Sequence, residues 1–174
     1  NLSSYIIATG DGSNAGDVML VTAYEELNKI SIEYLQSILR LFNKTAKEVC
    51  EGQQMDMDFE KMDTVALDAY LKMIELKTSV ALAASLQTGA ILGGAGERNQ
   101  NLLYEFGKKL GIAFQVQDDY LDAFGDPAKF GKQVGGDILS NKKTFLLLHA
   151  LETASVSQQK ELHNLLANNA TDKI

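Results

Sequence analysis

Residues 115–122 read QVQDDYLD and lie within a stretch, 100–124, that we expect to form one helix. Each residue of a helix advances by about 100°, so side chains three, four and seven positions apart share one face. The polar side chains on this face are Gln115, Asp118, Asp119 and Asp122. Mostly apolar residues surround them, which indicates a helix buried on most sides with its carboxylates turned into a cavity. An acidic stripe on the surface is the alternative reading.

The rest of the chain also favours helices. It has 174 residues, of which 45% are hydrophobic, a length sufficient for one compact domain. Its single proline and its many Ala, Leu, Lys and Glu residues favour helix over strand. No segment alternates between apolar and polar residues, and no repeat of fixed period is present. We therefore expect an all-α fold.

Breaks in the helical spacing predict where these helices begin and end. Residues 1–16 read as an irregular arm, and residues 17–50 as one long helix, or as two with a break near 28–31. Gly52 is expected to interrupt the pattern, and Asp63 to cap a second long helix that ends near residues 93–96. After the aspartates, we expect a loop over 125–137 and two shorter helices over about 138–153 and 157–168.

Charge and cysteine content exclude several classes of protein. The net charge of −7 and the pI near 4.8 argue against nucleic acid as a partner, because binding to a phosphate backbone usually rests on a basic face. The single cysteine, Cys50, cannot form an internal disulfide, and no signal peptide is evident, so we expect a cytoplasmic location. No apolar run reaches the ~18 residues that a membrane span needs.

The aspartates suit a hard divalent cation. Mg²⁺ typically takes one or two carboxylates, several waters and phosphate oxygens of a substrate. A calcium-binding EF-hand loop is excluded, because counting from Asp118 places Tyr120, Ala123 and Lys129 where Asp or Asn, Gly and Glu are required. A zinc site is not indicated either, since no two of the possible soft ligands share a motif spacing. Those ligands are Cys50, His149 and His163.

Lysines follow the aspartates closely and could hold a phosphate bound to such a metal. They are Lys129, Lys132, Lys142 and Lys143, and several glycines between them would let the backbone approach a ligand. Lys77 stands with Thr78 in the apolar stretch ELKTSVALAAS, where burial without an anionic partner would be costly. The alternative for each lysine is an ordinary solvated or snorkelling side chain.

Taken together, these segments resemble the trans-isoprenyl diphosphate synthases, the polyprenyl synthetase family that includes farnesyl and geranylgeranyl diphosphate synthases. Five segments match the family in order between Gly16 and about Leu151. They are GDVML with AYEEL at 16–27, EGQQMD at 51–56, LKTS at 76–79, FQVQDDYLD at 114–122 and GKQVGGDILSNKKT at 131–144.

The resemblance implies a fold and a reaction. The fold would be an isoprenoid synthase-type bundle of long antiparallel helices around a central cavity, forming homodimers through early helices that here offer Met19, Tyr24 and Leu35. The reaction would be Mg²⁺-dependent condensation of an allylic diphosphate with isopentenyl diphosphate, with release of diphosphate. The product's chain length is not decided by these residues.

The resemblance also implies roles for individual residues. Mg²⁺ on the allylic diphosphate would be held by Asp118, Asp119 and Asp122. The departing diphosphate would be held by Lys77, Lys132 and Lys142, while Thr78 and Gln115 would line the place where positive charge develops. Gln53 and Asp56 would support the polar wall, and we expect Lys129 and Lys143 to be solvated.

One departure from the family pattern limits this reading. The family's first aspartate-rich motif, with the arginines after it, should precede Gly16, yet residues 1–15 contain neither. We therefore expect residues 1–15 to be an irregular or foreign arm and residues 16–174 a partial polyprenyl synthetase domain that is inactive alone. The alternatives are a non-catalytic fragment or partner subunit that binds diphosphate, and a purely structural bundle with a solvated acidic stripe.

Overall fold

The computed structural model describes residues 12–130, 135–140 and 142–167, and within these ranges it contains helices and no strand. The expected all-α fold is therefore confirmed. The elements in chain order are α2 (Gly12–Leu27), α3 (Ile32–Phe59), α4 (Leu67–Ile74), the π-helical segment η1 (Glu75–Ser79), α5 (Val80–Leu92), α6 (Glu97–Phe124), α7 (Pro127–Phe130), α8 (Gly136–Leu139), α9 (Phe145–Thr153) and α10 (Val156–Ala167).

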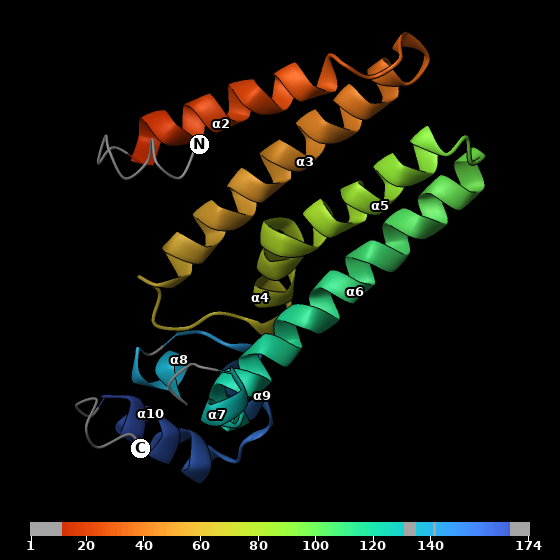
Figure 1. The fold of residues 1–174 in the computed structure, drawn as a ribbon. Helices are drawn as coiled ribbons and strands as arrows, with labels where there is room; N and C mark the ends of the chain where they lie inside the picture. The colour runs from red at the N-terminus through yellow and green to blue at the C-terminus, as the bar shows by residue number, and fades with distance from the viewer. Residues whose placement is uncertain (1–11, 131–134, 141, 168–174) are drawn as a thin grey trace.

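Three long rods determine the shape of the molecule. Helices α3, α5 and α6 lie side by side, and α5 and α6 are antiparallel neighbours joined by a short turn (Figure 1). Helix α2 packs on α3 at one side, whereas α8, α9 and α10 gather at the C-terminal end of α6 (Figure 1). Asp118, Asp119 and Asp122, in the last two turns of α6, therefore lie where the rods meet the small C-terminal helices.

The N-terminal helices differ in part from expectation. Of the two alternatives for residues 17–50, the one with a break near residues 28–31 is confirmed, since α2 ends at Leu27 and α3 begins at Ile32. The expectation of an irregular arm over residues 1–16 is wrong for residues 12–16, which belong to α2; residues 1–11 lie outside the described part. The expected interruption at Gly52 is also wrong, because α3 continues through it to Phe59.

Gly52 serves helix packing instead. A Cβ atom placed on Gly52 would lie 2.3 Å from the backbone nitrogen of Lys77, and one on Gly111 of α6 would lie 2.6 Å from the Cα atom of Ser79. Real Cβ atoms do not approach other atoms so closely. The two missing side chains therefore let α3 and α6 close on the π-helical segment from two sides.

The second long helix begins and ends close to the expected places. Its N-cap is Ala66 rather than Asp63, and no side chain caps it. It then runs from α4 through η1 into α5 and ends at Leu92, so the expected end near residues 93–96 is confirmed. Gly94 has φ 71°, the left-handed conformation that glycine adopts at helix ends.

The segment after α6 is more helical than expected. The short helices α7 and α8 occupy part of the expected loop, and residues 131–134 lie outside the described part. Helix α9 begins at Phe145 rather than near Ile138, because the Thr144 side chain accepts a hydrogen bond from the Leu147 amide and caps the helix.

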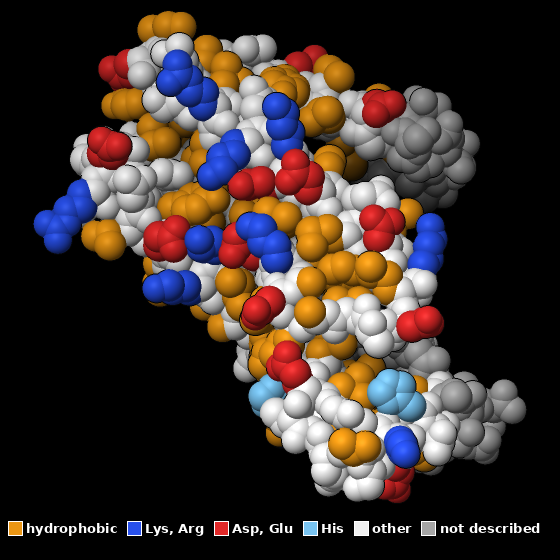
Figure 2. All heavy atoms as spheres, turned by 180° about the vertical axis from the view of Figure 1, so that it is seen from behind, with side chains coloured by type: hydrophobic (Ala, Val, Ile, Leu, Met, Phe, Trp, Pro, Cys, Tyr) orange, Lys and Arg blue, Asp and Glu red, His pale blue; other side chains and the backbone are white. Residues whose placement is uncertain are grey.

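A small apolar core joins α4 to α9. Its buried members are Tyr70, Met73, Ile74 and Leu148. On the face opposite to the view of Figure 1, acidic and basic side chains are interspersed with apolar ones and do not form a basic patch (Figure 2). Over the described residues, no helix combines the length and the apolar character that crossing a bilayer requires.

Candidate functional site

The π-helical segment η1 presents two of the expected site residues to different neighbours. Lys77 Nζ lies 2.5 Å from Asp56 Oδ2 on α3. Thr78 Oγ1 donates a hydrogen bond of 3.3 Å to Gln115 Oε1 on α6. Adjacent residues of a helix point about 100° apart, so a single turn can contact both flanking helices. Such π-helical turns within α-helices are frequent at functional sites.

The aspartates of α6 do not form a single cluster. Asp119 is only 3% exposed, and its Oδ2 accepts hydrogen bonds from the Tyr70 hydroxyl at 2.5 Å and from the Phe145 amide at 2.8 Å. Burial raises the pKa of Asp119 above its ordinary value, although these two hydrogen bonds oppose the shift. The Asp119 carboxylate is therefore engaged with α4 and α9.

Asp122 is engaged with the segment that follows α6. Its Oδ2 accepts a hydrogen bond of 2.9 Å from the Asp137 amide, and its backbone oxygen accepts one of 2.7 Å from the Gly135 amide. Asp118 is half-buried on the same helix. Within the described ranges, no group of three or more His, Cys, Asp or Glu side chains is arranged to hold a metal ion. The metal-binding roles of the three aspartates stay predictions.

Lys142 and Asp56 line one cavity of about 500 Å³. Lys142 Nζ lies 3.2 Å from Asp137 Oδ1. Burial alone would lower the pKa of Lys142, but the nearby carboxylates, Asp137 foremost, outweigh it and raise that pKa. The complete lining is Asp56, Phe59, Glu60, Ser140, Lys142 and Lys143. Asp56 thus forms an ion pair with Lys77 and lines the same cavity as Lys142.

The remaining expected residues are less closely associated. Gln53 is exposed on α3, and Lys132 lies outside the described residues. Lys129 is exposed, as expected, whereas Lys143 is half-buried and lines the cavity, so its solvation stays a prediction. The signal available in the sequence was Thr144, a residue type preferred at N-caps, which indicates that a helix starts directly after Lys143.

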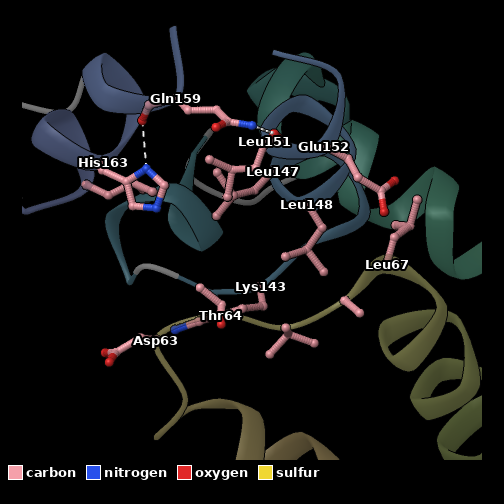
Figure 3. A pocket seen from close by; sticks show the side chains of 13 residues that line it. Asp63, Thr64, Leu67, Lys143, Leu147, Leu148, Leu151, Glu152, Gln159 and His163 are labelled. Carbon is pink, nitrogen blue, oxygen red and sulfur yellow. Dashed lines mark hydrogen bonds between the residues drawn. The ribbon is translucent and has the colours of Figure 1, made fainter. Parts of the chain in front are cut away.

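A second cavity, of about 620 Å³, lies between residues 63–67 and the helices α9 and α10 (Figure 3). Leu147, Leu148 and Leu151 form much of its wall, and Lys143 lines this cavity as well. On the α10 side, His163 Nδ1 lies 2.6 Å from the backbone oxygen of Gln159 (Figure 3). Nothing in the sequence indicated this apolar space, because its walls come from segments about 80 to 100 residues apart.

The arrangement of long helices, with a lysine-bearing turn facing an aspartate-bearing helix, is that of the isoprenoid synthase class. The family model for polyprenyl synthetase matches residues 7–174, and the chain belongs to this family. The chain is 40% identical over 155 residues to a short chain isoprenyl diphosphate synthase of Methanocaldococcus jannaschii. The matched segment covers 88% of this chain and 47% of that relative.

Solved structures agree with the family assignment. A crystal structure of a geranylgeranyl pyrophosphate synthase superposes with a TM-score of 0.83 at 47% identity, over 91% of this chain and 48% of that one. A geranylgeranyl pyrophosphate synthase from Corynebacterium glutamicum, complexed with isoprenyl diphosphate and magnesium, gives a TM-score of 0.77 at 28% identity, over 91% of this chain and 48% of that one. The chain thus spans about half the length of the relatives it matches.

Proposed function

We propose that this chain forms part of a prenyltransferase that condenses an allylic diphosphate with isopentenyl diphosphate and releases diphosphate. The observation that carries the proposal is the convergence of Lys77 and Lys142 on the surroundings of Asp56. Two cations from distant parts of the chain, beside an acidic helix, suit a doubly charged phosphate ligand. The names of the relatives, which are isoprenyl and geranylgeranyl diphosphate synthases, support the same reaction.

The lysines would act on the leaving group. Each is paired with a carboxylate in the structure, Lys77 with Asp56 and Lys142 with Asp137. A diphosphate entering the cavity would take over these ammonium groups, because a diphosphate group carries several negative charges and a carboxylate carries one. Cations already in place stabilise the charge that develops on the departing diphosphate, most strongly where water is excluded.

Magnesium fits this donor set in part. Mg²⁺ needs only one or two protein carboxylates when substrate phosphates and waters complete its coordination. Asp118 would hold it, with Asp122 one helical turn away on the same face. Asp119 is less available to a metal, because its Oδ2 already accepts hydrogen bonds from the Tyr70 hydroxyl and the Phe145 amide. When bound, the metal neutralises phosphate charge and so assists cleavage of the allylic carbon–oxygen bond.

The contact between Thr78 and Gln115 would stabilise the positive charge that develops on the allylic carbon when diphosphate leaves. Their side-chain oxygens lie 3.3 Å apart, and Thr78 directly follows Lys77 in the chain. Oxygen dipoles fixed in a wall of otherwise apolar residues stabilise a nearby positive charge without having to reorient. We place the allylic carbon near this pair, where isopentenyl diphosphate would attack it.

Calorimetry tests the proposal with Mg²⁺ and a non-hydrolysable thiolo analogue of an allylic diphosphate. We expect binding that requires both components and that is lost in Asp118→Asn. Asp58→Asn is the matched control, because Asp58 is exposed and bonded to Gln54 on α3. If the folded wild-type chain gives no heat of binding, the proposal is refuted. Binding without turnover of radiolabelled isopentenyl diphosphate would indicate a diphosphate-binding part that does not catalyse alone.

We also propose that the protein forms a homodimer through its N-terminal helices. Helix α2 exposes a run of apolar side chains, including Met19 at 51% and Val21 at 59%, which would be unfavourable in water. Light scattering combined with sedimentation velocity tests this. We expect a dimer that Met19→Glu shifts toward monomer, and a wild-type chain that stays monomeric at micromolar concentration would refute it.

A further inference from the structure

Tyr70 is a buried polar residue that the proposed reaction does not use directly. It is 3% exposed and lies in the apolar core between α4 and α9. A hydroxyl group buried without a partner is costly, and here it donates to Asp119 Oδ2 at 2.5 Å. Burial raises the pKa of Tyr70 above its ordinary value, so the hydroxyl keeps its proton and remains a donor. The Tyr70 hydroxyl therefore fixes the direction of the Asp119 carboxylate.

The same carboxylate oxygen holds the start of α9. Asp119 Oδ2 accepts the amide of Phe145, the first residue of that helix, at 2.8 Å. The first amides of a helix lack partners within the helix, and a carboxylate placed there also interacts favourably with the helix dipole. One oxygen atom thus joins α4, α6 and α9.

Lys142 lies three residues before this attachment point. Its backbone oxygen accepts the Thr144 amide at 3.0 Å, and its amide donates to the Asp137 oxygen at 2.9 Å. At the far end of the segment, the Asp137 amide donates to Asp122 Oδ2 at 2.9 Å. Two carboxylates of α6 therefore hold this lysine segment at both ends.

We propose that Tyr70 is a positioning residue, which acts through Asp119 and the Phe145 amide to hold Lys142 where diphosphate binds. This role rests on the function proposed above. Without the Tyr70 hydroxyl, Asp119 loses the partner that orients it, and the start of α9 is free to shift together with Lys142. Tyr70 itself does not contact the substrate.

Tyr70→Phe tests the role, because it removes one oxygen atom and keeps the aromatic ring in the core. Calorimetric titration with inorganic diphosphate and Mg²⁺ should show affinity about 10- to 100-fold weaker, the usual effect of losing a residue that orients a ligand-binding group. Tyr34→Phe is the matched control, since it lies 22 residues before Asp56 on α3, roughly 33 Å along the helix axis. Its affinity should stay within about twofold of the wild type, and an equal loss in both variants would overturn the proposal.

A double-mutant cycle with Lys142→Gln separates positioning from a general loss of stability. Because Tyr70 acts through Lys142, adding Tyr70→Phe to Lys142→Gln should weaken binding by less than about twofold further. Fully additive losses would overturn the proposal, since Tyr70 would then act elsewhere. If Tyr70→Phe fails to fold, Asp119→Asn replaces it in the same cycle, because its amide oxygen still offers one acceptor.

Hydrogen exchange at the Phe145 amide tests the link from Tyr70 to the start of α9 without any ligand, whereas diphosphate binding separates failure of this inference from failure of the proposed function. We expect exchange about tenfold faster in Tyr70→Phe than in the wild type, since the acceptor of that amide is no longer fixed. If the wild type binds no diphosphate, the proposed function fails, and the positioning role fails with it. If the wild type binds and Tyr70→Phe binds equally well, only the positioning role is overturned, whatever the exchange rate.

Discussion

Lys77 Nζ and Asp56 Oδ2 lie 2.5 Å apart and join the π-helical segment η1 to α3. The Lys77 side chain is 36% exposed and the Asp56 side chain 18%, so water screens this ion pair only in part. The pair has two consequences. It holds Lys77 in one direction before any ligand arrives, and it fixes a turn whose backbone geometry differs from that of the α-helix on either side.

Replacing both members of the pair should show that they interact. We expect a coupling energy of about 0.5–1 kcal/mol between Lys77→Gln and Asp56→Asn in urea unfolding, because a partly exposed pair gains little over its hydration. Raising the salt concentration to 1 M should reduce the coupling, since the Debye length then falls to about 3 Å. A coupling of zero at low salt would show that the two side chains do not interact in solution.

Gly52→Ala should destabilise the fold strongly. The new Cβ would lie 2.3 Å from the Lys77 nitrogen, and relieving that overlap requires α3 to move from η1, at a cost of about 1–3 kcal/mol or more. Gly89→Ala in α5 is the control, because no atom lies within 4 Å of its added Cβ. The control should gain about 0.5–1 kcal/mol from helix propensity. Chemical unfolding measures both, and equal changes would contradict the close packing of η1.

Gly135→Ala should destabilise the segment that carries Lys142. Gly135 has φ 78°, and an alanine held in this left-handed conformation costs about 1–2 kcal/mol. Gly136→Ala is the control, since its Cβ would lie 3.5 Å from Asp122 Oδ1, an ordinary contact. Thermal unfolding should show a lower midpoint for the first variant alone. A lower midpoint for Gly136→Ala alone would indicate that Gly136, and not Gly135, adopts the left-handed conformation.

Leu148→Ala should remove much of the core between α4 and α9. Leu148 is 6% exposed and packs in the cluster that contains Tyr70, so its truncation should cost about 2–5 kcal/mol. Leu165→Ala, at a residue 46% exposed on α10, should change the free energy of unfolding by about 0.5 kcal/mol or less. Urea unfolding followed by circular dichroism measures both. Similar losses would show that α9 is not held by this core.

The sequence by itself determined the helical class, the approximate course of the long helices and the family. Apolar residues at helical spacing specify a buried face whatever packs against it, so the helix carrying Asp118 was found to its end at Phe124, with its start placed three residues late. The break between α2 and α3 and the end of α5 were also found, because local backbone preferences mark them. These features depend on neighbours within a few residues along the chain.

The tertiary structure alone decided what adjacent side chains do. Asp118 and Asp119 have the same chemistry and neighbouring positions, yet Asp119 turns into the core because Tyr70 and the Phe145 amide, 49 and 26 residues away, supply its hydrogen bonds. Gly52 looked like the end of a helix, and only the approach of Lys77 shows that it is a packing contact. Spacing along a sequence gives the direction of a side chain, but its partners come from elements that only folding brings beside it.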